Sequence, residues 1–260
     1  MLKKILLGTS GILVAASMAS TAANALVIDS FSDSSQRIII AGPAANVTVT
    51  RLDNAGGGVA SGEELGAQTT IIGGYRDIST TLVFSPDDES FTRSNANISD
   101  NGLFRHVQDT GVRSHTYITW NGLAGAGLGG ADLTDGGTSD SFHLVVHQAD
   151  LGLDWSLEVS DGVDTSAFIF PSSFVASDTD FYISFSVFSA LIDFSSIERI
   201  TFGANINNVD SLDTAVNLIE TVCGPRNQCI PTRLVPEPAS LTLLGAGIMG
   251  LGAIKRRRKV

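Results

Sequence analysis

The sequence predicts an all-β fold, a jelly-roll-like antiparallel β-sandwich, flanked by an N-terminal signal helix and a short C-terminal transmembrane helix. Three observations support the sandwich. Short apolar stretches recur between clusters of Gly, Asn, Asp and Ser, which favour turns. Asp outnumbers Glu, and Asp favours turns over helices. Apolar and polar residues alternate most clearly in residues 181–187, as in a half-buried strand, whereas a helical period is nearly absent from the body of the chain.

The strands follow in order from the apolar stretches. About 200 residues lie between the predicted signal helix and the predicted C-terminal helix, enough for one sizeable β domain. Within residues 181–187, the side chains of Phe181, Ile183, Phe185 and Val187 are predicted to share the buried face of one strand. The predicted strands are 26–31, 37–40, 47–52, 68–72, 78–84, 91–94, 115–120, 141–148, 155–159, 167–170, 180–188, 197–202 and 212–222.

Residues 1–25 have the pattern of a secretory signal peptide. Two lysines near the start are followed by a short apolar stretch, and the small residues Ala23 and Ala25 form an A-x-A cleavage site. Signal peptidase is therefore an expected partner, and we expect the mature chain to begin at Leu26.

The last 25 residues combine three unlike features: the triplet Pro236-Glu237-Pro238, the apolar stretch 239–254 and five consecutive basic residues. As a helix, the apolar stretch would span roughly 24 Å, short of the ~30 Å hydrocarbon core, so it is marginal as a permanent anchor. The basic residues would stay cytoplasmic.

This tail resembles the PEP-CTERM sorting signal of Gram-negative bacteria. The resemblance implies export across the inner membrane, transient anchoring through the C-terminal helix and processing by an exosortase at the Pro-Glu-Pro triplet. It also implies a destination at the cell surface or in the extracellular space, in bacteria that build extracellular polysaccharide. An ordinary anchor that is never cut is the alternative.

Cys223 and Cys229 are the only cysteines of the chain, and in an exported protein we expect so close a pair to form a disulfide. Closing this short loop would stabilise the fold by roughly 2–2.5 kcal/mol in the chain-entropy model. The chain therefore divides into a signal peptide (1–25), a β-sandwich domain (26–222), a disulfide-containing stalk (223–235) and a sorting and anchor segment (236–260).

The charge of the body excludes nucleic-acid binding. All 27 acidic residues lie between Leu26 and Pro238. Without the seven basic residues of the two terminal signals, nine arginines remain, so the mature body has a net charge of −18. Such a surface repels DNA, RNA and anionic lipid. It also repels acidic polysaccharide unless divalent cations bridge the two.

Three phrases in the body resemble a group of secreted bacterial β-sandwich proteins that often have this tail. They are residues 27–31 (Val-Ile-Asp-Ser-Phe), 73–78 (Gly-Gly-Tyr-Arg-Asp-Ile) and 192–197 (Ile-Asp-Phe-Ser-Ser-Ile). The group is similar to carbohydrate-binding jelly rolls, which implies extracellular polysaccharide as the candidate ligand. Arg76, in the second phrase, is expected to form a structural salt bridge with a nearby carboxylate across the turn that the two glycines allow, with ligand contact as the alternative.

The sequence predicts no catalytic residues, no resident metal and no cofactor. His143 and His147 have an i, i+4 spacing, but on a strand their rings would lie roughly 13 Å apart, too far to share one metal ion. Glu158 or Glu198 could serve a glycosidase, yet no pattern places them together in a cleft. The Asp-rich stretch 132–140 has two interpretations, a calcium site or ordinary Asp-Gly turns.

A sugar-stacking site is predicted at Trp120, which precedes a glycine-rich loop, with help from Asn121 and Tyr75. Packing of Trp120 in the core is the alternative. Two function classes follow: a non-catalytic surface or matrix protein that binds exopolysaccharide, or a purely structural or adhesive surface protein with no specific ligand. Ice binding is a third class, but it usually needs ranked Thr-x-Thr strands, and the chain has only residues 48–50.

Overall fold

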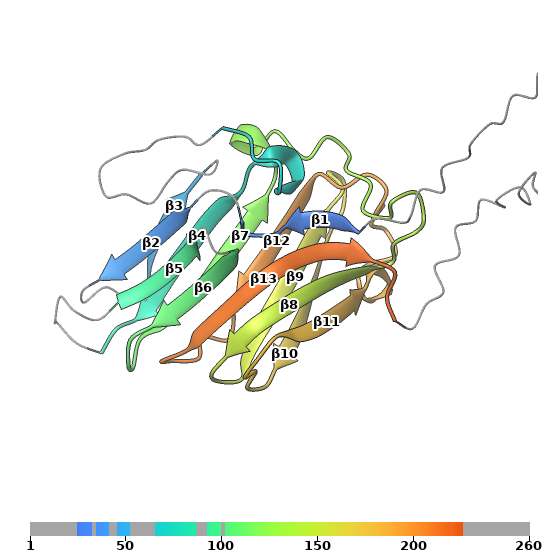
Figure 1. Cartoon of the computed structure of the whole chain (residues 1–260). Coiled ribbons are helices and arrows are strands. Elements are labelled where there is room, and N and C mark those ends of the chain that lie inside the picture. The colour runs from blue at the N-terminus through green and yellow to red at the C-terminus, as the bar shows by residue number, and fades with distance from the viewer. Residues whose placement is uncertain are drawn as a thin grey trace, which may run out of the picture.

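A computed structural model describes residues 25–32, 35–41, 46–52, 66–86, 93–99 and 102–225. Within these ranges the chain forms two antiparallel β-sheets packed face to face, which confirms the all-β sandwich (Figure 1). The predicted signal helix and C-terminal helix lie outside the described residues. Inside them, no helix is long and apolar enough to cross a membrane.

The seven-stranded sheet has the order β11-β8-β13-β6-β5-β2, and β1 pairs with β13 at one end. Its central strand β13 is the last strand of the described residues and β1 is the first. The two lie side by side, with Leu26 opposite Thr221. The strands are β1 (Leu26–Asp29), β2 (Gln36–Ala41), β5 (Arg93–Ser99), β6 (Leu103–Gln108), β8 (Ser141–Ala149), β11 (Thr179–Ser184) and β13 (Asp213–Val222).

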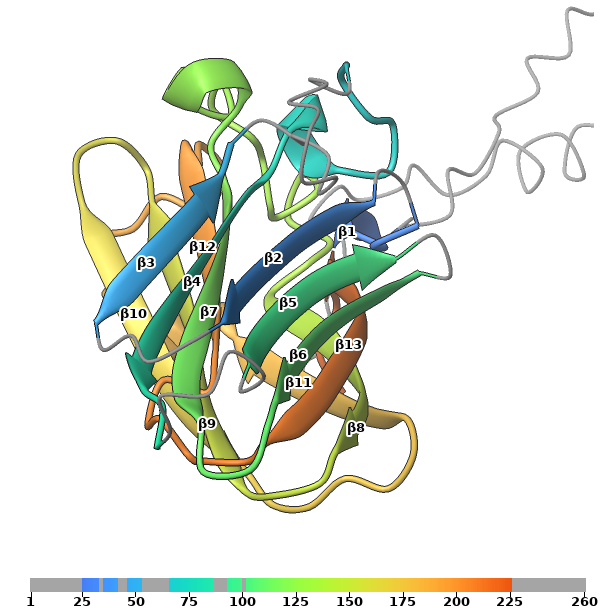
Figure 2. The ribbon, with the colours of Figure 1, turned by 90° about the vertical axis from the view of Figure 1, so that its left-hand side faces the viewer.

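The six-stranded sheet has the order β10-β9-β12-β7-β4-β3. Figure 2 separates the two layers, with β3, β4 and β7 on the left and β2, β5, β6 and β13 on the right. The strands are β3 (Val47–Arg51), β4 (Asp77–Phe84), β7 (Arg113–Trp120), β9 (Leu153–Ser160), β10 (Thr165–Ser172) and β12 (Arg199–Ala204).

Alternating side chains from both sheets fill the space between the layers. In β4, Ile78, Thr80 and Leu82 are buried, and the alternate residues Ser79 and Thr81 are half-buried. Trp155 of β9 stacks on Phe202 of β12, with ring centroids 5.5 Å apart. Each large apolar side chain that is fully buried stabilises the fold by roughly 1.5–3 kcal/mol. The period-2 pattern in the sequence therefore determines which face of each strand joins the core.

Three local predictions are wrong. Strand β6 was not predicted, because its inward side chains include the polar His106 and Gln108, which mask the apolar alternation. The predicted strand 68–72 is a turn, closed by a hydrogen bond from Gln68 N to Gly74 O, that leads into the 3₁₀ helix η1 (Ile72–Gly74).

The third wrong prediction concerns the strand 180–188. Strand β11 stops at Ser184, whose hydroxyl accepts a hydrogen bond from Ser186 N and caps the 3₁₀ helix η3 (Phe185–Val187). The turn breaks the two-residue period, so Val187 is 44% exposed instead of sharing the buried face of Ile183.

Candidate functional site

Trp120 is buried, and this corrects its predicted role in sugar stacking. The side chain has no exposed area, and its indole Nε1–H donates a hydrogen bond to Asp29 Oδ2 at 3.0 Å. A ring without an accessible face cannot stack on a ligand. Tyr75 and Asn121 are half-buried, and with the indole inside the core the three residues do not form a stacking platform. The packing alternative for Trp120 holds.

The carboxylate that Trp120 contacts belongs to a buried ion pair. Both oxygens of Asp29 accept hydrogen bonds from Arg76 Nη1, at 2.7 and 2.8 Å, and both side chains have zero exposure. Arg76 Nε also donates to Gln36 Oε1 at 2.8 Å, and Phe31 N donates to Asp29 Oδ1 at 2.7 Å. The structural salt bridge expected of Arg76 is therefore present, but its partner lies 47 residues upstream and not across the glycine turn as predicted. It joins two of the three resembling phrases, 27–31 and 73–78.

Several predicted features lie outside the described residues: Ala23, Cys229, Pro236, Glu237 and Pro238. Their roles stay predictions, as does the disulfide between Cys229 and Cys223, which follows β13. Ala25 is the first described residue, and it is exposed.

The Asp-rich stretch 132–140 uses its own donors to satisfy its first carboxylate. Asp132 accepts hydrogen bonds from Thr134 N, Thr134 Oγ1 and Gly136 N, at 2.6 to 3.0 Å. Burial would raise the pKa of Asp132, but these hydrogen bonds outweigh it and lower the pKa below its ordinary value. Within the described ranges, no group of three or more His, Cys, Asp or Glu side chains could hold a metal ion.

On the outer face of the seven-stranded sheet, histidine and carboxylate side chains contact one another over β8, β11 and β13. His143 points outward, with Nδ1 2.8 Å from Glu220 and Nε2 2.9 Å from Asp180. Its ring stacks on Tyr182, with centroids 4.7 Å apart. His147 contacts Asp178 at 2.7 Å. These imidazoles and carboxylates are therefore already in contact with one another.

The other end of the same face, at β2, β5 and β6, contains a hollow of about 140 Å³. Its floor is one cross-strand row in which Ile39 lies opposite Asn95 and Asn95 opposite Val107. Arg37, Arg93 and Asp109 complete the lining. Among the described residues, Asn95 Oδ1 is buried and has no hydrogen-bond partner. The hollow therefore combines an apolar floor with an unsatisfied amide oxygen.

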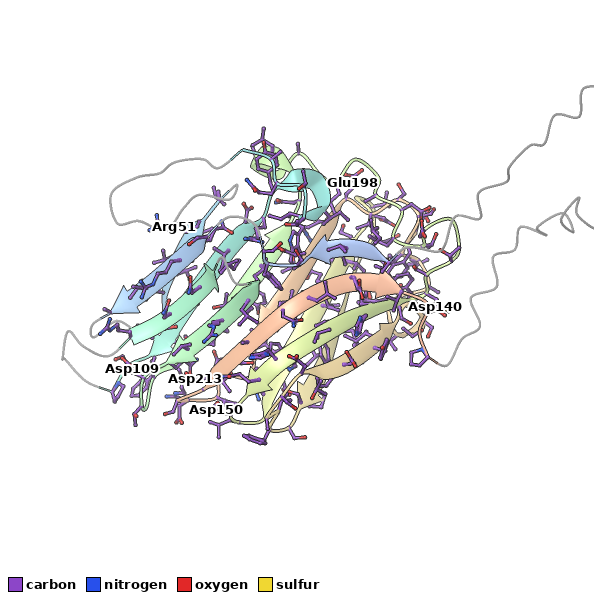
Figure 3. The ribbon with its side chains drawn as sticks, viewed as in Figure 1. Arg51, Asp109, Asp140, Asp150, Glu198 and Asp213 are labelled. Atoms are coloured by element: carbon purple, nitrogen blue, oxygen red, sulfur yellow. The ribbon has the colours of Figure 1, made fainter. Side chains whose placement is uncertain are left out.

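An arginine row borders this hollow. Arg37 of β2 lies opposite Asn97 of β5, and Asn97 lies opposite Arg105 of β6. At roughly 4.8 Å between strands, the Cα atoms of the two arginines are about 10 Å apart. In the part of the chain that the structure describes, neither arginine forms an ion pair. Figure 3 shows Asp109, Asp213 and Asp150 along the lower edge of the sheet, so negative charge gathers at that edge.

The outer face of the six-stranded sheet is largely satisfied by its own contacts. Hydroxyls pair across neighbouring strands, as in Thr48 with Thr81 at 2.8 Å and Thr119 with Thr201 at 3.2 Å. The ring of Tyr117 occupies the space over Gly203, where an added Cβ would lie 2.8 Å from Tyr117 Cε1. The polar groups of this face therefore largely bond to each other.

Sequence reasoning missed the hollow and the arginine row. Their residues come from three strands, one of which was not predicted, and no contiguous motif links them. The one available signal was the rarity of positive charge in the body, which makes each of its nine arginines worth placing.

Comparison with known proteins identifies the C-terminal segment. Residues 234–259 match the PEP-CTERM protein-sorting motif. The chain carries this sorting signal. The match covers the predicted triplet, apolar stretch and basic end, and it leaves the sandwich unassigned. No curated protein matches the chain.

Among solved structures, carbohydrate-binding modules are similar to the chain. A family 11 module from Clostridium thermocellum, in complex with a β-1,3-1,4-mixed-linked tetrasaccharide, is 12% identical with a TM-score of 0.38, covering 78% of this chain and 98% of the module. TmCBM61, in complex with β-1,4-galactotriose, is 10% identical with a TM-score of 0.31 over 56% and 82%. A family 29 module is 10% identical with a TM-score of 0.30 over 73% and 90%. At these TM-scores the likeness identifies no ligand or binding residue here.

Proposed function

We propose that this is an exported, non-catalytic surface protein whose sandwich binds extracellular polysaccharide on the outer face of the seven-stranded sheet. The observation that supports this most directly is the hollow over β2, β5 and β6, with an unpartnered amide oxygen in its lining. A buried polar atom without a partner costs stability. Rotation of the Asn95 side chain toward the hollow would let a bound hydroxyl supply that partner and remove the cost.

The chemistry of the hollow suits a sugar. Ile39 and Val107 offer apolar contact to the C–H groups of a sugar ring, and Asn95 can both donate to and accept from hydroxyls. Arg37 and Arg93 donate, and Asp109 accepts. Enclosed small-molecule sites usually have volumes of roughly 300–1,000 Å³. A shallow hollow of about 140 Å³ better fits one unit of a polymer that continues across the sheet.

A non-catalytic role agrees with the contacts of the two candidate glycosidase acids. Glu158 pairs with Arg199 at 2.8 Å on the six-stranded sheet, and Glu198 Oε2 accepts a hydrogen bond from Gly129 N at 3.0 Å. Both carboxylates hold local structure, and neither lines the hollow.

The sorting motif supports the route to the surface. In this proposal signal peptidase cuts after Ala25, the C-terminal helix anchors the chain transiently in the membrane, and an exosortase cuts near Pro236–Pro238. The Cys223–Cys229 disulfide would stiffen the short stalk in between. Mass spectrometry of the surface or culture-medium protein tests this route. The intact basic tail on most molecules would contradict cleavage.

The proposed ligand is tested by calorimetric titration of the purified mature protein, with and without calcium, with the exopolysaccharide of the bacterium that produces it. We expect binding by the wild type and a loss of affinity in Asn95→Ala. Thr81→Ala, which removes a hydroxyl from the opposite face, is the matched control and should bind normally. If the wild type binds no polysaccharide, the alternative of a purely structural or adhesive surface protein replaces this proposal.

A further inference from the structure

The positive charge on the seven-stranded sheet conflicts with the charge of the rest of the protein. Three of the seven arginines in the described residues, Arg37, Arg93 and Arg105, lie on the neighbouring strands β2, β5 and β6 and point to the outer face. The mature body has a net charge of −18. A local cluster of arginines on so acidic a body needs a reason, since solubility alone would not require it.

We propose that the polysaccharide bound at this face is anionic, a chain with carboxylate-bearing sugars that crosses β2, β5 and β6 along the row Arg37–Asn97–Arg105. This inference rests on the proposed function and specifies its ligand class. The guanidinium groups of Arg37 and Arg105 bind carboxylates, and Asn97 between them bonds to hydroxyls.

The residue types fit this chemistry. A guanidinium presents a planar fork of N–H donors that matches the two oxygens of a carboxylate, which makes arginine the preferred residue for carboxylate recognition. Structural arginines of this protein are already engaged: Arg76 binds Asp29, and Arg199 binds Glu158. Among the described residues, Arg37 and Arg105 have no such carboxylate partner. An anionic ligand would supply the missing counter-charge.

The acidic edge of the sheet fixes where such a chain lies. Asp109, Asp150 and Asp213 gather at one end of the strands (Figure 3). Burial raises the pKa of Asp213, and the negative charges of Asp150 and Asp109 raise it further, so this end already resists additional negative charge. An anionic chain would be repelled from the edge and held along the arginine row. Asn97 separates the two arginines by one strand, so each can contact its own carboxylate.

The test compares matched polysaccharides that differ only in charge. Polygalacturonate, alginate and the host exopolysaccharide are each prepared with native carboxylates and with the carboxylates reduced to alcohols, and titrated with the purified mature protein. We expect binding to at least one native polymer, weakened about tenfold or more in its reduced form, because hydrogen bonds to charged groups are the stronger ones. Binding to the native polymer should also weaken as salt is added.

Variants locate the effect on the sheet. Arg37→Gln and Arg105→Gln together should weaken binding of the native polymer by at least about tenfold. Binding of the reduced form should weaken much less, because only the hydrogen bonds from Arg37 to hydroxyls are then lost. Arg113→Gln is the charge-matched control for each single variant, because it removes one positive charge from the six-stranded sheet, where Arg113 lies 4.7 Å from the Phe84 ring centroid. It should change affinity less than about twofold. Arg37→Lys keeps the charge without the fork and should recover only part of the affinity.

The outcomes separate this inference from the function on which it rests. Equal affinity for native and reduced polymers would overturn the anionic class and leave polysaccharide binding standing. Equal losses in the single variant Arg105→Gln and in Arg113→Gln would show that net charge, rather than this row, controls binding, and would overturn the site. Failure to bind any polymer in either form would overturn both proposals.

Discussion

The protein uses arginine in two opposite ways, one inside the sandwich and one on its surface. Arg76 is fully buried, contacts both oxygens of Asp29, donates to Gln36 and lies 5.8 Å from the Phe31 ring centroid. Arg37 and Arg105 project from the seven-stranded sheet, and within the described residues neither forms an ion pair. Arginine therefore holds the fold together in one region and is an available hydrogen-bond donor in the other.

The difference shows how to separate residues that hold the fold from residues that are available to a ligand. A buried guanidinium must have a counter-charge, because leaving it unpaired costs several kcal/mol. A surface guanidinium has no such requirement, so its placement is free to follow a ligand. Removing an interior arginine should change stability and leave the surface chemistry intact. Removing an outer one should do the reverse.

The largest expected effect comes from breaking the interior pair. Arg76→Met leaves the Asp29 carboxylate buried without its counter-charge, and we expect a loss of about 3–5 kcal/mol in the free energy of unfolding. Urea unfolding of the purified domain measures it. The double variant Asp29→Leu/Arg76→Met should recover much of the loss, because no buried charge then remains. A loss below about 1 kcal/mol in Arg76→Met would show that the pair contributes little.

His106 provides a second buried basic group, this time without a carboxylate. Its Nδ1 lies 2.9 Å from Thr116 Oγ1, and its Nε2 lies 2.9 Å from the Gln108 amide nitrogen. Because the amide nitrogen donates, Nε2 accepts and the ring is neutral. Burial, helped by the charge of His115, lowers the pKa of His106 to about 4. The interior therefore holds a charged arginine only where Asp29 balances it.

The pH dependence follows from that lowered pKa. Between pH 6.5 and 4 the unfolded chain binds a proton on His106 that the folded chain excludes, so this contribution is fully present above pH 6.5 and is lost as the pH falls toward 4. The loss amounts to about 3 kcal/mol. Urea unfolding at pH 7, 5.5 and 4 should show a shallower decline for His106→Gln than for the wild type. Parallel declines would mean that His106 is not the titrating group.

A smaller effect is expected at Trp120, which supports the interior pair from the side. Trp120→Phe keeps most of the buried ring but removes the hydrogen bond from Nε1 to Asp29 Oδ2. Hydrogen bonds to charged groups are worth about 1.5–3 kcal/mol, and a loss of that size should appear in thermal or urea unfolding. Polysaccharide affinity per folded molecule should not change. A loss below about 0.5 kcal/mol would show that this hydrogen bond contributes little to the interior pair.

The sequence was sufficient to predict a strand where its apolar and polar residues alternate. Most strands were predicted, because apolar residues alternate on the buried face and Asp, Asn and Gly mark the turns. It failed where the interior is polar. Strand β6 was missed because His106 and Gln108 occupy core positions, and their partners Thr116 and Ser114 come from a strand of the other sheet.

The candidate site was harder to predict for a related reason. Trp120 was chosen because it precedes a glycine-rich loop. The alternation along β7 instead places its indole on the buried face, where it donates to the Asp29 carboxylate. The residues of the hollow and the arginine row are brought together only by the register of β2, β5 and β6. No local pattern reports which strands become neighbours in a sandwich. Arg76, by contrast, was correctly expected to be structural. Its partner was not predictable from the local pattern, because Asp29 lies 47 residues upstream and not across the neighbouring turn.

The smallest expected effect completes the comparison. Arg37→Gln and Arg105→Gln, singly or together, should change the free energy of unfolding by less than about 0.5 kcal/mol, because surface substitutions away from packing and ion pairs rarely do more. Thermal unfolding at matched pH and salt measures this, beside Arg76→Met as the destabilised reference. If the outer variants lost more than about 1 kcal/mol, their guanidinium groups would be structural as well. The reason for assigning them to an anionic ligand would then fail, whatever the titrations showed. If stability is unchanged while affinity for the carboxylated polymer falls, the outer arginines are placed for binding and Arg76 for the fold.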